Sequence, residues 1–267
     1  MSFIAKKSLG QNFLHAPHIA GMMIHAVGIK AGDTVLEVGP GKGALTSALL
    51  DAGARVIAVE KDIRSVEFLT EKFSTEIKDK NLKLISADIL EFDPAAEISG
   101  DYIIAANIPY YVTGEFLRKF SESKHQPKKM ILMLQKEVGK RIASDAKESI
   151  LSISVKAYGK PSYIETVQAR HFRPIPKVDS AVVLIDAISK DFFIKNNLTE
   201  SHFFTILKAG FAHKRKVLIK NLQKIAEKEV LEKIWNKIGI SSNARAEDIS
   251  LDNWGQMASF IANPDLL

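Results

Sequence analysis

Residues 34–43 read TVLEVGPGKG, an apolar run that passes directly into a glycine-rich turn. The run at 34–38 has the length and composition of a strand buried inside a sheet. Glycines at 39, 41 and 43 permit a tight turn in which the backbone can approach a ligand, followed by a helix at 44–52 that ends at Gly53. Such a turn suits NAD, FAD or a phosphate group equally well, so it predicts a ligand-binding α/β unit without identifying the ligand.

The alternation of short strands and amphipathic helices continues through the first two-thirds of the chain. Further strands are expected at residues 55–59, 82–87, 101–106, 129–134, 150–158, 163–168 and 180–186, and a second helix at 63–74. This pattern predicts a Rossmann-like α/β domain at residues 1–189, with a mostly parallel sheet and helices on both faces. From residue 199 the apolar spacing is helical, so residues 190–267 are expected to form a small all-helical domain.

Polar side chains stand at the ends of the strands that follow the glycine turn. Glu60 ends the second expected strand, Asp88 follows the third and Asn107 follows the fourth. Because ligands of open α/β sheets bind at the carboxyl ends of the strands, these residues and the glycine turn predict a single site. There Glu60 could accept both hydroxyls of a ribose, and Asp88 could accept an adenine amine. These residues alone leave a dehydrogenase possible.

The motif Asn107-Ile108-Pro109-Tyr110 indicates chemistry on an aromatic amine. The lone pair of such an amine is delocalised into its ring, and two hydrogen-bond acceptors placed against its two protons favour the nucleophilic form. The side-chain oxygen of Asn107 and the backbone carbonyl of Ile108 supply this pair, while Pro109 stiffens the turn. Tyr110 offers a flat face for stacking on a flipped base, worth about 1–3 kcal/mol. The motif predicts methyl transfer to an adenine amine without a general base.

Composition and charge limit the classes of protein to which the chain can belong. It has 267 residues, 46% of them hydrophobic, and 37 Lys and Arg against 31 Asp and Glu give a net charge of +6, which is compatible with a polyanionic partner. There is no cysteine, which excludes disulfides and thiolate metal sites, and the histidines show no ligand spacing, so no metal is expected. No signal-peptide pattern and no apolar run of about 18 residues is present, so we expect a monomeric cytoplasmic protein that does not contact membranes.

At these motifs the chain resembles the ribosomal RNA adenine N6-dimethyltransferases, in particular the KsgA/RsmA type that modifies two adjacent adenosines near the 3′ end of 16S RNA. The resemblance begins at residues 7–14 and extends over nearly the whole length. It implies S-adenosylmethionine as the methyl donor, the small ribosomal subunit with its 16S RNA as the partner, and Asn107 as a contact of both cofactor and target amine. The cofactor-binding residues that it implies are Asn12, Leu14, Gly39, Gly41, Glu60, Asp88 and Asn107.

Later segments resemble the same family. Residues 172–180 (FRPIPKVDS) are similar to its later motif, in which Phe172 would flank the flipped base as a further catalytic-site residue. Residues 211–222 and 243–247 resemble its helical domain.

A run of positive charge lies in this helical part. Residues 208–224 contain six basic residues and no acid. The candidates for contacts with RNA phosphates are Lys214, Arg215, Lys216 and Lys220. A solvated helix face is the alternative interpretation of such a run.

Three alternatives remain open on the sequence. An Erm-type enzyme, which methylates one 23S adenosine and confers macrolide resistance, shares the motifs around Asn107 and Phe172, but residues 211–222 and 245–247 favour the 16S interpretation. A Rossmann oxidoreductase is more remote, because its fingerprint is Gly-x-Gly-x-x-Gly whereas glycines 39, 41 and 43 alternate with single residues. A non-catalytic RNA-binding or assembly factor is the third, and an Asn107→Ala variant separates it from an enzyme.

Overall fold

The computed structural model describes residue 6 and residues 10–144 and 146–264, and it forms two compact units. The described parts of residues 1–140 and 160–188 make the first unit, and those of residues 141–159 and 189–267 make the second. The break after residue 188 lies next to the expected boundary, but the second unit also includes 141–159, which the sequence pattern assigns to the first domain. Residues 7–9 of the N-terminal motif lie outside the described residues.

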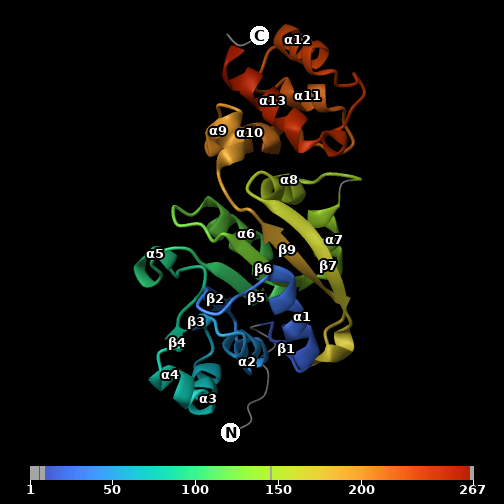
Figure 1. The fold of residues 1–267 in the computed structure, drawn as a ribbon. Helices are drawn as coiled ribbons and strands as arrows, with labels where there is room; N and C mark the ends of the chain where they lie inside the picture. The colour runs from blue at the N-terminus through green and yellow to red at the C-terminus, as the bar shows by residue number, and fades with distance from the viewer. Residues whose placement is uncertain (1–5, 7–9, 145, 265–267) are drawn as a thin grey trace. The chain divides into compact units, whose positions relative to one another are not determined.

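A seven-stranded sheet is the centre of the first unit (Figure 1). Its strands are β2 (Thr34–Val38), β3 (Arg55–Glu60), β4 (Leu82–Ser86), β5 (Ile103–Asn107), β6 (Lys129–Gln135), β7 (Lys160–Val167) and β9 (Ser180–Asp186). Their order is β4-β3-β2-β5-β6-β9-β7, and pairing is parallel from β4 to β6 and antiparallel on both sides of β9. The expected α/β architecture is confirmed. Because β2 lies between β3 and β5, the sheet has a topological switch point at the glycine turn.

The helices of the first unit pack against this sheet. They are α1 (Pro17–Val27), α2 (Ala44–Asp51), α3 (Ile63–Lys72), α4 (Ser74–Lys78), α5 (Pro94–Glu97) and α6 (Thr113–Glu122), and α7 (Lys136–Ala143) crosses into the second unit. Val35 and Leu36 are neighbours in β2, so their side chains point to opposite faces of the sheet. Both are completely buried, which shows that both faces of the sheet are covered at this strand. Met23 of α1 and Leu49 of α2 pack in the same core as Val35. The glycine turn is thus held between a buried strand and a buried helix.

A short ribbon of two strands and two 3-10 helices complete the first unit. A two-stranded antiparallel ribbon joins β1 (Phe13–Leu14) to β8 (Phe172–Arg173), with Phe13 opposite Arg173 and Leu14 opposite Phe172. The 3-10 helices η2 (Tyr110–Val112) and η3 (Ala169–His171) precede α6 and β8. The ribbon brings the N-terminal motif and the later motif together, although about 160 residues separate them in the chain.

The prediction of a strand at residues 150–158 was wrong, because this segment forms α8 (Ile150–Lys156) of the second unit. Ser149 and Ser152 make a capping box: the Ser152 backbone N–H donates to Ser149 Oγ at 3.1 Å, and the Ser149 N–H donates to Ser152 Oγ at 2.7 Å. These bonds satisfy amide groups that the first turn of a helix leaves open. Ile153 and Ala157, one turn apart, are buried in the core of the second unit. The helical spacing therefore prevails over the Ile and Val content that favours a strand.

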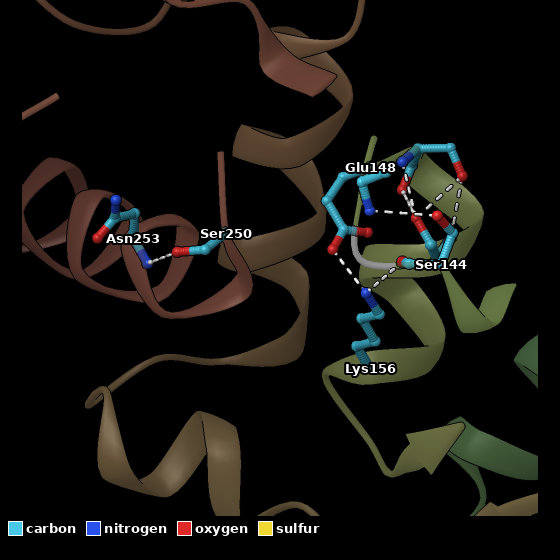
Figure 2. Close-up of polar contacts among 8 residues, drawn as sticks. Ser144, Glu148, Lys156, Ser250 and Asn253 are labelled. Atoms are coloured by element: carbon cyan, nitrogen blue, oxygen red, sulfur yellow. Dashed lines mark hydrogen bonds and ion pairs between the residues drawn. The ribbon is translucent and has the colours of Figure 1, made fainter. Parts of the chain in front are cut away.

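A buried ion pair ties α8 to the loop before it (Figure 2). Lys156 Nζ donates to Glu148 Oε1 at 2.7 Å and to the Ser144 carbonyl at 2.7 Å, and the Lys156 and Glu148 side chains are only 13% and 9% exposed. The Glu148 N–H also donates to the carbonyl of Glu247 at 2.8 Å. The bond to Glu247, together with the packing of Ile153 and Ala157 in the core, joins residues 141–159 to the helical unit.

The rest of the second unit is helical, as the apolar spacing predicts. Its helices are α9 (Asp191–Lys195), α10 (Glu200–Gly210), α11 (Leu218–Leu222), α12 (Lys228–Ile238) and α13 (Leu251–Ala262), with the 3-10 helix η4 (Ala246–Asp248). Trp254 is fully buried and stacks on Phe211 with ring centroids 5.6 Å apart, and a side chain on Gly210 would collide with the Trp254 ring. Among the described residues, no helix is long and apolar enough to cross a membrane.

Candidate active site

A cavity of about 420 Å³ lies where β2, β3 and β5 end. Its volume is within the range of small-molecule sites, roughly 300–1,000 Å³. Because neighbouring parallel strands end at the same edge of the sheet, the side chains that follow them meet here. The predicted residues that line the cavity are Asn12, Leu14, Gly39, Gly41, Glu60, Asp88, Asn107, Ile108, Pro109 and Tyr110.

The glycine turn brings bare backbone to the cavity. Gly41 and Gly43 have φ angles of +57° and +76°, in the left-handed region that favours glycine. A Cβ on Gly41 would lie 2.7 Å from the Phe13 ring, and one on Gly43 would lie 2.5 Å from the Phe73 ring. Larger residues are therefore excluded at both positions, by backbone conformation and by packing.

Glu60, the last residue of β3, is 8% exposed and points its carboxylate toward the glycine turn. Its Oε2 accepts from the Gly41 N–H at 3.2 Å, and its Oε1 accepts from the Asp62 N–H at 2.9 Å. Burial raises the pKa of Glu60, and these two backbone donors limit the rise. Because each carboxylate oxygen accepts more than one hydrogen bond, the group can also accept from a ligand hydroxyl.

Asp88 follows β4 and is held as an anion at the cavity wall. Its Oδ2 lies 2.6 Å from Lys61 Nζ, and its Oδ1 accepts from the Leu90 N–H at 2.9 Å. The hydrogen bond from Lys61 and then that from Leu90 lower the pKa of Asp88. Since its side chain is 26% exposed and that of Lys61 58% exposed, the pair adds little stability, but it keeps an acceptor of fixed position in the cavity.

Asn107, the last residue of β5, is oriented by the N-terminal motif. Its Nδ2 donates to the Asn12 carbonyl at 3.1 Å, which leaves Oδ1 as the end that can accept from a ligand. The Ile108 N–H donates to the Met133 carbonyl at 3.2 Å, and the Ile108 side chain is 1% exposed. The backbone at Ile108 is therefore held in place by its hydrogen bond to β6 and by the packing of its side chain in the core.

Tyr110 stands beside this pair in η2, with its ring held by the later motif. Its hydroxyl lies 2.9 Å from Ser180 Oγ, at the fully buried first residue of β9. Burial raises the pKa of Tyr110, so the phenol stays neutral. This bond orients an aromatic ring at the cavity.

Phe172 does not reach the cavity, although the resemblance places it beside a flipped base. It lies opposite Leu14 in the β1–β8 ribbon, is 1% exposed and packs in the core with Val167. The described residues that line the cavity include Tyr110 but not Phe172. A contact between Phe172 and a base stays a prediction.

Glu37 lines the cavity and is not among the predicted site residues. It is 1% exposed, and within the described residues neither of its oxygens has a hydrogen-bond partner. Burial raises the pKa of Glu37 to about 8; Thr46 lies close enough to limit the rise but outside hydrogen-bonding geometry, and Glu60 adds to it. The signal that could have identified Glu37 is an acid inside an otherwise apolar strand.

Comparison with known proteins identifies the family of the chain. The model of the ribosomal RNA adenine dimethylase family matches residues 2–263. The chain belongs to this family. Its relatives include proteins named ribosomal RNA small subunit methyltransferase A: that of Dehalococcoides mccartyi is 39% identical over 97% of this chain and 90% of its own length, and that of Fusobacterium nucleatum is 40% identical over 95% and 96%. The family resemblance in the sequence is confirmed, and the chain is an rRNA adenine N6-dimethyltransferase that uses S-adenosylmethionine.

Solved structures of two members of the methyltransferase class share the fold. A dimethyladenosine transferase from Plasmodium falciparum has a TM-score of 0.79 at 24% identity, covering 92% of this chain and 95% of that one. The 23S rRNA methyltransferase ErmE has a TM-score of 0.75 at 22% identity, covering 94% and 100%. These likenesses establish the class I S-adenosylmethionine methyltransferase fold. Because enzymes of both kinds have it, the preference for the small subunit comes from the sequence relatives.

Proposed function

We propose that the chain, as a monomer in the cytoplasm, transfers methyl groups from S-adenosylmethionine to the N6 amines of two adjacent adenosines near the 3′ end of 16S RNA in the small ribosomal subunit, as a step of ribosome biogenesis. The observation that carries the proposal is the Asn107 amide, whose nitrogen is bound to the Asn12 carbonyl so that its oxygen is available in the cavity. The name shared by the relatives supports the choice of the small subunit.

The residues at the cavity fit the methyl donor. Glu60 would accept from its ribose hydroxyls, Asp88 from its adenine amine, and the backbone at Gly39 and Gly41 would line its amino-acid part, with Asn12 and Leu14 closing the wall. When bound, the donor supplies a methyl group on a sulfonium, which is already an excellent leaving group. The proposed mechanism uses no metal.

The work of the protein is then to prepare the nucleophile. Asn107 Oδ1 and the Ile108 carbonyl would each accept a hydrogen bond from one N–H of the adenine amine, which frees the lone pair of its nitrogen for in-line attack. Pro109 restricts Ile108 toward an extended conformation, and Tyr110 would stack on the flipped base. The proton leaves the methylated amine without a dedicated base.

Replacing Glu60 with glutamine is expected to weaken S-adenosylmethionine binding about 10- to 100-fold, because a charged acceptor of the ribose is lost. Titration calorimetry with the purified protein measures the effect. The matched control is Glu71→Gln, at an exposed position of α3, which should bind the donor like the wild type. An unchanged dissociation constant in Glu60→Gln would show that the ribose is held elsewhere.

The basic run of the second unit is the proposed RNA contact. All six of its basic side chains are exposed, and none forms an ion pair with another described residue. The backbone beneath them is fixed by Asn221, which is 2% exposed and whose Nδ2 donates to the carbonyls of Gly210 at 2.6 Å and His213 at 3.2 Å. Exposed charges without ion-pair partners, on a segment whose backbone is held in place, favour phosphate binding over a merely solvated face. Its members are Lys208, Lys214, Arg215, Lys216, Lys220 and Lys224.

Changing Lys214, Arg215 and Lys216 together to glutamine is expected to raise the KM for small subunits about 10-fold or more and to reduce the salt slope of binding by about 2–3. Methylation and filter binding at several salt concentrations measure this. The control carries three glutamines at exposed lysines of the same unit, Lys195, Lys228 and Lys233. If both triple variants lose the same affinity, net charge and not this run is responsible.

The function itself is tested by incubating the protein with methyl-labelled donor and unmodified small subunits, then mapping the label. We expect two adjacent adenosines near the 3′ end of 16S RNA, each with two methyl groups. Label confined to 23S RNA would support the Erm-type alternative. No label together with tight NAD binding would support an oxidoreductase.

A further inference from the structure

A group of basic side chains outside the cavity has no role in the proposed chemistry. It consists of His15, which follows β1, His18 of α1, Arg170 and His171 of η3, and Arg173 of β8. We call these five residues the histidine–arginine cluster. They come from two short segments of the first unit, residues 15–18 and 170–173, which the fold brings together.

The cluster has a defined geometry. The His15 N–H donates to the His171 carbonyl at 3.1 Å, and the His18 and His171 rings meet edge to face with centroids 5.2 Å apart and an interplanar angle of 77°. Arg173 lies opposite Phe13 in the β1–β8 ribbon, and Phe13 lines the cavity. The cluster therefore adjoins the cavity wall.

Its positive charge is not compensated within the described part of the chain, where no acid forms an ion pair with it. Asp179, the acid that follows it in the chain, is engaged elsewhere: Oδ1 accepts from the Ala169 N–H at 3.1 Å and Oδ2 from Lys136 at 3.4 Å. Partial burial, and then His18, Arg170 and His15 close by, lower the pKa of His171. When the imidazoles are protonated, the positive charges of the cluster repel one another, and a bound anion would reduce this repulsion.

The donor types indicate which ligand the cluster takes. Three histidines could suggest a metal ion, but among the described residues no three histidine or acidic side chains are arranged to hold one. Guanidinium groups bind phosphate oxygens through paired N–H donors, and protonated imidazoles add charge-assisted bonds. Four members, His15, His18, Arg170 and Arg173, are exposed and accessible to a polymer.

We propose that the histidine–arginine cluster binds phosphate groups of the RNA strand that flanks the adenosine entering the cavity. The inference rests on the proposed function, since it takes ribosomal RNA as the substrate. Phosphate contacts fix the register of a nucleic acid on a protein without reading its sequence. Contacts so near the cavity wall would hold the strand next to the flipped base.

Binding of RNA phosphates to the cluster is expected to be coupled to protonation of its imidazoles. A phosphate group bound beside an imidazole favours the protonated form of the ring. RNA binding therefore takes up protons and strengthens as pH falls from about 8 to about 6. The neighbouring arginines stay charged throughout, so their contribution does not change with pH.

The test uses the full chain and unmethylated small subunits in filter-binding measurements at about pH 6 and about pH 8.5. We expect His15→Gln/His18→Gln to bind about 3- to 10-fold more weakly than the wild type at pH 6 and equally at pH 8.5. Arg170→Gln/Arg173→Gln should weaken binding at both pH values. His25→Gln, an exposed histidine on the same helix as His18, is the matched control and should behave like the wild type.

The proposal is overturned if the double histidine variant, with a wild-type melting temperature, binds like the wild type at pH 6. It is also overturned if His25→Gln shows the same loss. Methyl transfer by the wild type is measured in parallel: if no ribosomal adenosine is methylated, the proposed function fails, whereas the binding comparison still tests the cluster.

Discussion

Replacing Asn107 with alanine is expected to lower the rate of methyl transfer about 10²- to 10³-fold, the usual loss when a positioned hydrogen-bonding group is removed from a reacting centre. The variant lacks the oxygen that would accept from the adenine amine and the Nδ2 donor that binds the Asn12 carbonyl. Single-turnover transfer of labelled methyl groups to unmodified small subunits measures the rate of the chemical step.

The control for this experiment is Asn81→Ala, at an exposed position before β4, which should methylate at the wild-type rate. Binding of small subunits by Asn107→Ala should fall much less than the rate, which separates an enzyme from a non-catalytic assembly factor. A variant that transfers methyl groups at the normal rate would refute the mechanism.

Replacing Glu37 with glutamine is expected to raise the free energy of unfolding at about pH 8.5 by several kcal/mol. Burial raises the pKa of Glu37 from 4.5 to about 8. An acid with a raised pKa holds a proton in the folded state that the unfolded state has lost. Stability therefore falls by about 1.4 kcal/mol for each pH unit between these two values. Glutamine has nearly the same shape and no charge to bury, so it removes this loss.

Denaturant unfolding between about pH 5 and about pH 9 measures the effect as a difference in slope. The wild type should lose stability toward high pH, and Glu37→Gln should lose less. Glu67→Gln, at an exposed position of α3, is the control and should follow the wild type. A Glu37→Gln protein as pH-dependent as the wild type would mean that Glu37 is not buried as a neutral acid.

Local pattern and parallel-sheet geometry were sufficient to predict most of the site. The strand at residues 34–38 is short and mostly apolar, and the glycines that follow it at 39, 41 and 43 are spaced for a tight turn. Parallel strands end at a common edge of the sheet. Glu60, Asp88 and Asn107 are therefore brought to one cavity, as predicted. What could not be read from the pattern is the bond from Asn107 to the Asn12 carbonyl, because it joins residues 95 positions apart.

The features that the sequence did not predict depend on tertiary packing. Residues 150–158 carry Ile and Val in a strand-like pattern. The helix is stabilised by the capping box of Ser149 and Ser152 and by packing in the core of the second unit. The burial of Phe172 depends on the pairing of β8 with β1. Glu37 appears in the sequence as part of a motif, and only its burial without a partner marks it as an unusual acid.

The most direct test of the proposed mechanism is a crystal structure of the protein with S-adenosylhomocysteine and adenosine. The account predicts the adenine N6 within about 2.7–3.2 Å of both Asn107 Oδ1 and the Ile108 carbonyl, facing the sulfur that carried the methyl group. An adenine bound with its N6 turned away from Asn107, or held by other acceptors, would contradict it.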